Sequence, residues 1–255
     1  MKTTIYRPKG RALEFSALAM NHYTGCGHQC IYCSAPLTLH ADRREWYANP
    51  RPRLTIDEMV AGIRKWDGPK EPVLLCFTTD PYQPIDDGLK LTRTAIELLN
   101  GHGFPVHILT KAGKLAQRDF DLLAAHPGNA FATTLTFTDH DDAREWEPYA
   151  ALPEDRMDNV MEARHRKITT WVSLEPVIEP LQTTKLIRTI APYTDHFKVG
   201  TLNYHARGRE IDWRQFGIRV MKQLYDVGAR YYVKKDLAGY LGKSEGFWGG
   251  PEADR

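Results

Sequence analysis

Short apolar runs alternate along this chain with longer segments of helical periodicity. Six runs rich in β-branched and aromatic residues predict strands at residues 73–79, 106–110, 131–137, 168–174, 197–202 and 230–235. The segments between them repeat apolar residues at helical spacing and predict helices at 91–100, 115–125, 156–166, 184–190 and 213–227. Such alternation is typical of a parallel sheet with crossover helices.

The chain ahead of residue 73 carries weaker signals. Four apolar residues share one helical face, namely Ile56, Met59, Val60 and Ile63. Thr55 and Glu58 form a capping box ahead of this face, and Asp212 with Gln215 offers a similar start for the last helix. One more strand is needed before the cysteines, and residues 17–24 are predicted to supply it.

The count of strand and helix pairs predicts an α/β fold of the barrel type. Each pair takes roughly 30 residues, the usual size of a βα unit. About six units fit the chain, so we expect a partial (β/α)6 TIM-like barrel rather than a full eightfold one. Residues 1–240 are expected to form this single domain, and the glycine-rich, charged tail at 241–255 is expected to be flexible.

Composition narrows the class of protein. Of 255 residues, 42% are hydrophobic, which is ample for a core, yet no run approaches the ~18 apolar residues of a membrane span. The N-terminus lacks the apolar stretch of a signal peptide, and four cysteines do not make a disulfide framework. We therefore expect a cytoplasmic protein without membrane contact. The net charge of +2 means that any contact with DNA must be a local patch.

Three of the four cysteines lie close together, at Cys26, Cys30 and Cys33. Thiolate is a soft ligand that suits zinc or an iron–sulfur cluster, and both usually have four protein ligands. A zinc site completed by a histidine is one interpretation, and the candidate fourth ligands are His22, His28 and His40. A second, distant pair of cysteines, common in structural zinc sites, is missing from this sequence.

The spacing Cys-x-x-x-Cys-x-x-Cys, with Tyr32 directly before the third cysteine, resembles the signature of radical S-adenosylmethionine (SAM) enzymes. Three segments in this order, "YTGCGHQCIYC", "TTDPYQP" and "ILTKAG", are similar to the spore photoproduct lyase-like branch of that superfamily. The resemblance implies a partial barrel with a [4Fe-4S] cluster on Cys26, Cys30 and Cys33. It also implies that SAM occupies the open iron beside Tyr32, and that an electron donor such as flavodoxin or ferredoxin reduces the cluster.

The resemblance also assigns SAM contacts to residues at the ends of predicted strands. Lys111 matches a lysine that contacts the SAM carboxylate, and Thr134 matches a hydroxyl near the same group. Thr79 and Asp80 stand where this branch places a hydroxyl and an acid for the SAM amine. Glu175 and Asn203 end later strands and are candidates for the ribose or adenine. Without the resemblance, Lys111 reads as an exposed lysine and "TDPYQP" as a proline-stiffened turn.

Two positions depart from the lyases. The lyases that this chain resembles have a hydrogen-donating cysteine at the position of Phe77 and a tyrosine at the position of Ser34. Cys76 is one residue earlier, so strand alternation predicts that it points away from the pocket; it remains a weak catalytic candidate. Because the lyase path for returning hydrogen is absent, repair of a thymine lesion is less favoured than the family suggests.

The leading functional hypothesis is therefore a rearrangement of a thymine-derived, hypermodified base in DNA. The opening "IYRPKGRALEFSALAMNHYTGC" resembles phage-associated relatives that hypermodify thymidine, some of which are proposed to be isomerases. The alternatives are photoproduct-lyase repair, radical SAM chemistry on a tRNA base, peptide or metabolite, and a zinc-binding nucleic-acid module. A duplex base would have to be flipped out to react.

A DNA or nucleotide substrate would need basic residues at the barrel mouth. Arginines with neighbouring aromatics suit phosphate contact and base stacking, and the candidates are Arg43, Arg44, Arg51, Arg53, the segment 162–167, Tyr204, Arg207, Arg209, Lys234 and Lys235. The alternative interpretation is an ordinary solvated face. The acidic "DHDD" at 139–142 is more simply a loop than a second metal site.

Overall fold

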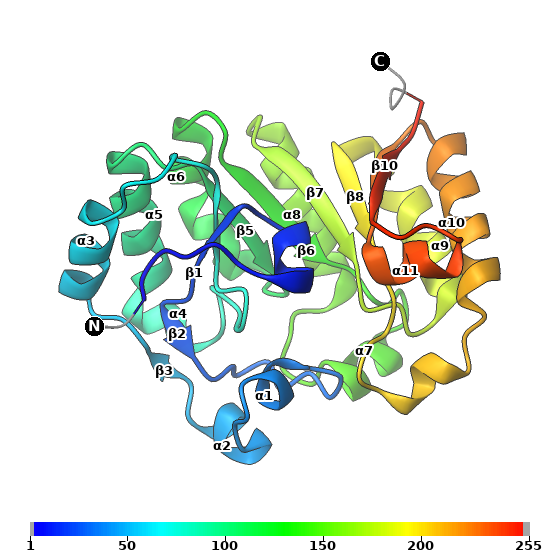
Figure 1. Cartoon of the computed structure of the whole chain (residues 1–255), viewed down its shortest axis with the longest axis horizontal. Helices are drawn as coiled ribbons and strands as arrows, with labels where there is room; N and C mark the ends of the chain where they lie inside the picture. Colours follow the sequence, from blue (N-terminus) through cyan, green and yellow to red (C-terminus); the bar gives the residue numbers. More distant parts are fainter. Residues whose placement is uncertain (1–2, 252–255) are drawn as a thin grey trace.

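The computed structural model describes residues 3–251 and is built on one mostly parallel sheet (Figure 1). Its eight strands follow the order β1-β4-β5-β6-β7-β8-β9-β10, and only the last pair, β9 with β10, is antiparallel. The strands are β1 (Leu18–Met20), β4 (Val73–Leu75), β5 (Val106–Thr110), β6 (Ala130–Thr134), β7 (Thr169–Leu174), β8 (His196–Val199), β9 (Arg230–Val233) and β10 (Phe247–Gly249). Because β1 and β10 are the sheet's edges, the expected partial barrel is confirmed.

Every predicted strand is present, but several end earlier than the sequence pattern suggested. The run 73–79 leaves the sheet after Leu75, because Cys76 adopts a left-handed φ of 58° that breaks the extended backbone. The run 17–24 is divided between β1 and the short β2 (Tyr23–Thr24), which pairs with β3 (Arg51–Pro52). The residues after each strand are thereby free to form the loops at its carboxyl end.

Helices cover the outer face of the sheet (Figure 1). They include every predicted helix, with the 115–125 segment divided between a 3-10 turn and a short α-helix: α3 (Ile56–Arg64), α5 (Leu91–Gly101), η2 (Lys114–Asp119), α6 (Phe120–Ala125), α8 (Pro153–His165), α9 (Pro180–Ile190), η3 (Ala191–Tyr193) and α10 (Trp213–Asp226). Shorter elements lie at the N-terminus or at the carboxyl ends of the strands: η1 (Gly10–Glu14), α1 (Ala35–Thr38), α2 (Arg43–Ala48), α4 (Ile85–Leu89), α7 (His140–Trp146), η4 (Ala206–Arg209) and α11 (Lys235–Tyr240).

Strand alternation divides the apolar side chains between two compartments. On β7, Val172 and Leu174 pack in the large core beneath the helices, whereas Trp171 joins the small interior core of the barrel. Phe15, just after η1, packs against Trp171 from the other side, with ring centroids 6.2 Å apart. Lys198 on β8 holds this segment in place by donating to the Phe15 carbonyl at 2.9 Å. The N-terminal segment therefore fills the barrel interior below its mouth.

Three local expectations were tested by the fold. The capping box of α3 is confirmed, since Thr55 Oγ1 accepts from the Glu58 amide and the Glu58 carboxylate accepts from the Thr55 amide. The predicted apolar face is only partly right, because Ile56 is 51% exposed while Met59 is buried. The "DHDD" segment is not a loop: Asp139 caps α7, so its carboxylate accepts from two helical amides.

Part of the tail that was expected to be flexible belongs to the sheet. Residues Phe247–Gly249 form β10 and pair with β9, with Trp248 opposite Tyr232. The Arg230 guanidinium lies 4.4 Å from the Trp248 ring centroid and helps to hold this edge. Residues 252–255 lie outside the described part of the chain. No helix within residues 3–251 is long and apolar enough to span a membrane.

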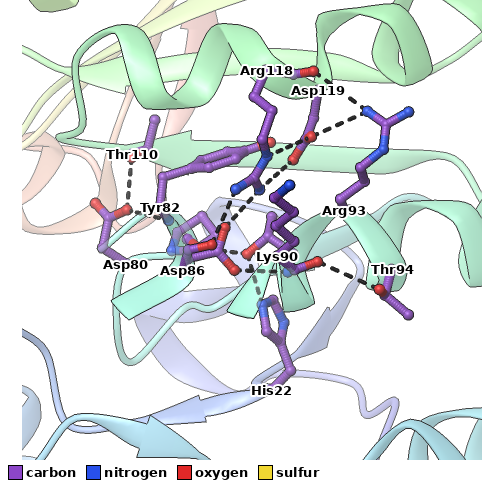
Figure 2. A network of polar contacts seen from close by, with 12 residues as sticks. His22, Asp80, Tyr82, Asp86, Lys90, Arg93, Thr94, Thr110, Arg118 and Asp119 are labelled. Carbon is purple, nitrogen blue, oxygen red and sulfur yellow. Dashed lines mark hydrogen bonds and ion pairs between the residues drawn. The ribbon is translucent and has the colours of Figure 1, made fainter. Parts of the chain in front are cut away.

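A buried polar network joins α4, α5 and η2 (Figure 2). The Arg118 guanidinium lies 2.7 Å from Asp86 and 2.8 Å from Asp119, and both carboxylates are fully buried. Asp86 also accepts hydrogen bonds from the Tyr23 hydroxyl at 2.6 Å and the Thr92 amide at 2.9 Å. Since Tyr23 belongs to β2, this network fixes the segment that leads into the cysteines.

Replacing Arg118 with Met is expected to destabilise the fold strongly. The substitution leaves the Asp86 carboxylate buried without its cation, and removing one partner of a buried ion pair costs roughly 3 kcal/mol or more. Urea denaturation of wild type and variant measures this difference in the free energy of unfolding.

Lys222→Met is the matched control. It removes the same kind of side-chain cation from the exposed Lys222–Asp226 pair on α10, where the side chains are 74% and 55% exposed. A change below about 0.5 kcal/mol is expected there. If the two substitutions lowered the free energy of unfolding equally, the buried Asp86 network would stabilise the fold no more than an exposed ion pair does.

Candidate functional site

A cavity of about 620 Å³, called the main cavity below, opens at the carboxyl ends of the strands. This is the end of a βα barrel at which binding residues normally gather. The cluster and cofactor residues predicted from the sequence all line it, from the cysteine loop and the carboxyl ends of β4, β5, β6, β7 and β8: Cys26, Cys30, Tyr32, Cys33, Cys76, Thr79, Asp80, Lys111, Thr134, Glu175 and Asn203. The fold therefore brings together segments up to 177 residues apart, from Cys26 to Asn203 (203 − 26).

The cysteine loop is fixed to α2 by its backbone. Gly25 has a φ of 76°, and a Cβ at this position would lie 2.7 Å from the Trp46 carbonyl oxygen, so only glycine fits. The Cys26 amide donates to that same carbonyl at 3.1 Å. The first thiol is thus placed by a glycine that permits close approach of two backbone segments.

Two side chains of α2 donate hydrogen bonds to the backbone carbonyls of the second and third cysteines. The Tyr47 hydroxyl donates to the Cys30 carbonyl at 2.6 Å, and Arg43 donates to the Cys33 carbonyl at 2.8 Å. Arg43 was a candidate for nucleic-acid contact, but its guanidinium is engaged by this loop. Its position there is structural.

The "TTDPYQP" segment clamps the loop from the opposite side. Gln83 is fully buried, and its amide accepts from the Gly27 amide at 2.9 Å and donates to the Gly25 carbonyl at 3.1 Å. These bonds hold the backbone on both sides of Cys26. The turn after β4 therefore both forms one wall of the cavity and fixes the backbone around Cys26.

Asp80 joins three segments at the cavity floor. Its carboxylate accepts from Thr110 Oγ1 at 2.7 Å and from the Lys111 amide at 2.7 Å, and His28 Nδ1 lies 3.3 Å away (Figure 2 shows the Thr110 contact). Burial alone would raise the pKa of Asp80, but His28, Thr110 and Lys111 lower it to about 2. The ionised carboxylate thus connects the cysteine loop to the end of β5.

A second buried carboxylate lies behind the loop. Glu147, which follows α7, is 2% exposed and accepts hydrogen bonds from the Tyr32 hydroxyl and, at 2.5 Å, from the Arg156 guanidinium. Arg156 also donates to the Thr134 carbonyl at 3.1 Å. Burial opposes ionisation of Glu147, yet Arg156 and Lys111 hold its pKa below the usual value. Tyr32 is thereby anchored from below.

Lys111 is a cation that lines the same cavity as the three cysteines and lies near Cys30. Its Nζ lies 5.5 Å from the Tyr32 ring centroid. Burial disfavours the charged form, but the nearby Cys30 and Glu147 raise the pKa of Lys111 above its usual value. The side chain therefore remains an ammonium in the cavity and presents a positive charge to any ligand there.

The opposite wall carries an ion pair. Lys234, 2% exposed, contacts the Glu175 carboxylate, and the Asn203 amide donates to the same carboxylate at 3.4 Å. A Cβ at Gly200 would lie 2.6 Å from Glu175, so the end of β8 leaves room for this side chain. Lys234 was a candidate for nucleic-acid contact; it is buried against Glu175 instead.

Cys76 packs in the large core beneath the helices with Val73 and Leu75, although the main cavity also reaches this residue. Phe77 faces the barrel interior instead, and its ring centroid lies 5.5 Å from that of Phe15. The Cys76 side chain therefore points toward the helix side of the sheet, the direction that strand alternation predicts. The Cys76 sulfur lies 3.4 Å from His22 Nδ1, and burial raises the pKa of the thiol to about 12.

The donors present in the cavity fit a cluster and a zwitterionic ligand. The buried Ser173 Oγ, in a residue that lines this cavity, lacks a hydrogen-bond partner within residues 3–251. Burial raises the pKa of Cys30 to about 12, so an isolated thiol stays protonated, whereas a coordinating thiol loses its proton.

The histidines considered for zinc lie in different places. His22 contacts Cys76 and the Thr92 hydroxyl at 3.0 Å, His28 contacts Asp80, and His40 is exposed. Across the described residues, no three His, Cys, Asp or Glu side chains are arranged to hold one metal ion. Thiolates of a cubane bind separate irons and need no such convergence.

Several other basic candidates are engaged in ion pairs. Arg164 pairs with Asp195, and Arg166 pairs with Glu162. Arg207 pairs with both Glu179 and Glu210, and Lys235 with Glu245. Arg51 donates to the Asn49 carbonyl and Arg53 to the Asn21 carbonyl. Much of the basic surface inferred from sequence is therefore neutralised or tied to the backbone.

Four important residues were missed by the sequence reasoning: Gln83, Glu147, Arg156 and Ser173. Glu147 lies between the 139–142 segment, which was interpreted as a loop, and the predicted helix 156–166, which Arg156 begins; no local pattern distinguishes a buried ion pair there. Gln83 belongs to the "TTDPYQP" segment, and its position three residues after Asp80 was the only sequence indication of a role in the site.

Comparison with known proteins agrees with this geometry. The model of the Radical SAM superfamily matches residues 20–188. Similar solved structures include Streptococcus suis SuiB bound to S-adenosylmethionine, with 14% identity, a TM-score of 0.63, and 84% of this chain and 49% of SuiB covered. Spore photoproduct lyase complexed with dinucleoside spore photoproduct has 15% identity and a TM-score of 0.62, covering 80% of this chain and 62% of the lyase.

Two proteins similar in sequence are named as uncharacterized, and they match most of this chain. An uncharacterized protein of Methanocaldococcus jannaschii is 24% identical over 190 residues, covering 73% of this chain and 71% of the relative. An uncharacterized protein of Mycobacterium bovis is 29% identical over 188 residues, covering 68% of this chain. The match spans only 53% of the mycobacterial protein, about half of its length.

The family match includes the cysteine loop, the Asp80 turn and Lys111, and the solved neighbours share the partial barrel. Members of this family are enzymes that use a [4Fe-4S] cluster and SAM and require a reductant. The chain belongs to the radical SAM superfamily.

Proposed function

We propose that this chain binds a [4Fe-4S] cluster through Cys26, Cys30 and Cys33 and uses SAM to abstract hydrogen from a thymine-derived base in DNA. The observation that carries the proposal is the shared cavity, which is lined by the three cysteines and by the Lys111 ammonium. When bound and reduced, the cluster supplies the electron that cleaves SAM to methionine and a 5′-deoxyadenosyl radical. The chain's own residues bind, orient and shield the reactants.

The methionine end of SAM would lie between the cysteine loop and β5. Lys111 provides the cation for its carboxylate, and the Thr134 hydroxyl lies on the same wall. The Thr79 hydroxyl, which lies beside Cys76 at the turn after β4, can contact the ammonium. Asp80 is engaged by His28, Thr110 and the Lys111 amide, so its proposed role is to position these neighbours and to add a negative field.

The ribose and adenine would face the opposite wall. Glu175 and Asn203 end β7 and follow β8, and both line the main cavity. Their oxygens and amide can hydrogen-bond a hydroxyl or a purine edge. Tyr32, anchored by Glu147, lies beside the loop as a flat apolar surface for the cofactor.

A thymine-derived substrate undergoing rearrangement is the form of the reaction that we favour. The support is the similarity of the opening segment to phage-type thymidine hypermodification enzymes, together with the fold shared with spore photoproduct lyase. In an isomerase, the abstracted hydrogen returns from 5′-deoxyadenosine and no protein thiol is required. Ser34, in place of the lyase tyrosine, agrees with this form.

Repair of a thymine lesion is the second candidate, and the fold shared with spore photoproduct lyase favours it. The Cys76 thiol packs against His22 in the helix-side core, so repair would need a hydrogen donor other than this thiol. Chemistry on a peptide remains an alternative, since SuiB has been solved with a precursor peptide. Four free cysteines fit a reducing compartment such as the cytoplasm, with flavodoxin or ferredoxin as the electron donor.

The substrate is tested by mass spectrometry of nucleosides. The anaerobically reconstituted protein, SAM and a reductant are incubated with unmodified, hypermodified or irradiated DNA. An isomerase predicts a product of unchanged mass and altered retention from hypermodified DNA, and a lyase predicts loss of the lesion from irradiated DNA. An unchanged profile in all three, alongside efficient SAM cleavage, would contradict a DNA substrate.

Cys30→Ala is expected to abolish formation of 5′-deoxyadenosine, because two thiolates do not retain a cubane in a defined place. Iron and sulfide analysis after reconstitution, with chromatography of the nucleoside product, measures both effects. Cys76→Ala is the matched control, since it removes a buried thiol outside the cysteine loop and should keep full iron content. Equal iron in the Cys30 variant and wild type would refute the ligand assignment.

Lys111→Gln is expected to weaken SAM binding by roughly ten- to a hundredfold, because a hydrogen bond between charged groups contributes about 1.5–3 kcal/mol. Anaerobic calorimetry with SAM measures the dissociation constant, and iron analysis confirms that the cluster is retained. Lys114→Gln, on the exposed start of η2, is the control and should bind SAM normally. Unchanged affinity in the Lys111 variant would remove this residue from the site.

A further inference from the structure

A second cavity of about 630 Å³, called the side pocket below, opens beside the main cavity. It lies after β8, between η4 and α11. The two cavities share Arg11, Thr201, Leu202, Asn203 and Tyr204, so a single ligand can reach from one into the other. None of the roles assigned above to the cluster or SAM uses its outer residues.

The floor of the side pocket is rigidly built. A Cβ at Gly208 would lie 2.6 Å from the Leu202 carbonyl oxygen, so glycine lets η4 pack directly on the end of β8. The buried Trp213 indole donates to the Gly208 carbonyl at 2.8 Å. Arg11 crosses from η1 to Asp236 of α11 at 2.5 Å, and Figure 1 shows these two elements side by side.

Two tyrosine rings are exposed at the rim. Tyr204 is 62% exposed and Tyr240 is 53% exposed. Tyr204 also has a left-handed φ of 61°, an uncommon conformation for a bulky residue that is found at ligand-binding positions. The Arg11 guanidinium lies 5.2 Å from the Tyr204 ring centroid and supports the ring from one side. The other side is free to stack on a planar group.

The charge of the side pocket comes from one arginine. Arg11 is neutralised by Asp236, and the neighbouring Arg207 is neutralised by Glu179 and Glu210. Arg209 lines the pocket and has no hydrogen-bond or ion-pair partner among residues 3–251. An exposed ring and an unpaired guanidinium on one short loop match a planar ligand that carries an anion.

We propose that the side pocket binds the nucleotide adjacent to the reacting one in a single-stranded or flipped-out polynucleotide. Tyr204 stacks on its base and Arg209 contacts its phosphate. The inference rests on the proposed function, because it takes the reacting base to lie in the main cavity. It adds that the substrate is a polynucleotide rather than a free base, since a free base would leave this pocket unused.

The test measures binding of two fluorescent probes to the reconstituted holoprotein by fluorescence anisotropy. One probe is a short single-stranded oligothymidylate, and the other is an abasic chain of the same length with the same phosphates. Wild type is expected to bind oligothymidylate more tightly than the abasic chain. Tyr204→Ala should weaken binding of oligothymidylate by roughly tenfold and leave the abasic chain unaffected, because the ring stacks on a base.

Arg209→Gln should weaken both probes and reduce the slope of log affinity against log salt by about 1, as expected for one lost phosphate contact. Arg219→Gln is the matched control, because Arg219 is an exposed arginine on α10 outside both cavities. It should bind both probes like wild type. Circular dichroism and iron analysis confirm that each variant is folded and loaded.

Three outcomes overturn the inference. Wild type that cleaves SAM but binds neither probe would show that the radical chemistry serves a different substrate. Equal binding by wild type and the Arg209 variant, or an equal loss in the Arg219 control, would place the phosphate contact elsewhere. A Tyr204 variant that weakens both probes alike would exclude base stacking. Failure of SAM cleavage in wild type is a separate result, which would remove the proposed function itself.

Discussion

The site depends on one buried carboxylate, that of Asp80. It accepts hydrogen bonds from Thr110 and the Lys111 amide and lies beside His28, so the cysteine loop, the turn after β4 and the end of β5 meet at a single group. These contacts lower its pKa to about 2, so the carboxylate is ionised at neutral pH. Three connecting segments are thereby held in one arrangement around the cavity that the cysteines and Lys111 line.

Charged side chains lie in two separate parts of the main cavity, one beside the cysteine loop and one at the ends of β7 and β8. On the cysteine side, Lys111 remains positive because Cys30 and Glu147 lie near it, and Arg156 balances Glu147. On the far side, Lys234 and Glu175 form a closed pair. Phe15 and Trp171 close the barrel interior between them with apolar surface. This division suits a cofactor with a zwitterionic end and a nucleoside end, and it shields a reactive species from water.

Much of this fold could be predicted from residue patterns, because each βα unit has strong local signals. The capping box at Thr55 and all seven parallel strands followed from such signals. The early end of β4 did not, since it comes from the left-handed φ of Cys76, which no residue pattern in this segment indicates. Glu147 and Gln83 could not be found either, because their roles come from packing between segments that are distant in sequence. Arg43 and Lys234 were misassigned for the same reason: a basic residue looks alike in sequence whether it binds a phosphate, a carbonyl or a buried acid.

The central claim is that the thiols hold a cubane with one iron open to SAM. Electron paramagnetic resonance of the anaerobically reconstituted, reduced protein tests it most directly, with and without SAM labelled with a magnetic nucleus in its amine or carboxylate. The account predicts the signal of a reduced [4Fe-4S] cluster that changes when SAM is added and shows coupling to the labelled nucleus. A missing cluster signal, or one that is indifferent to SAM and shows no coupling, would contradict it.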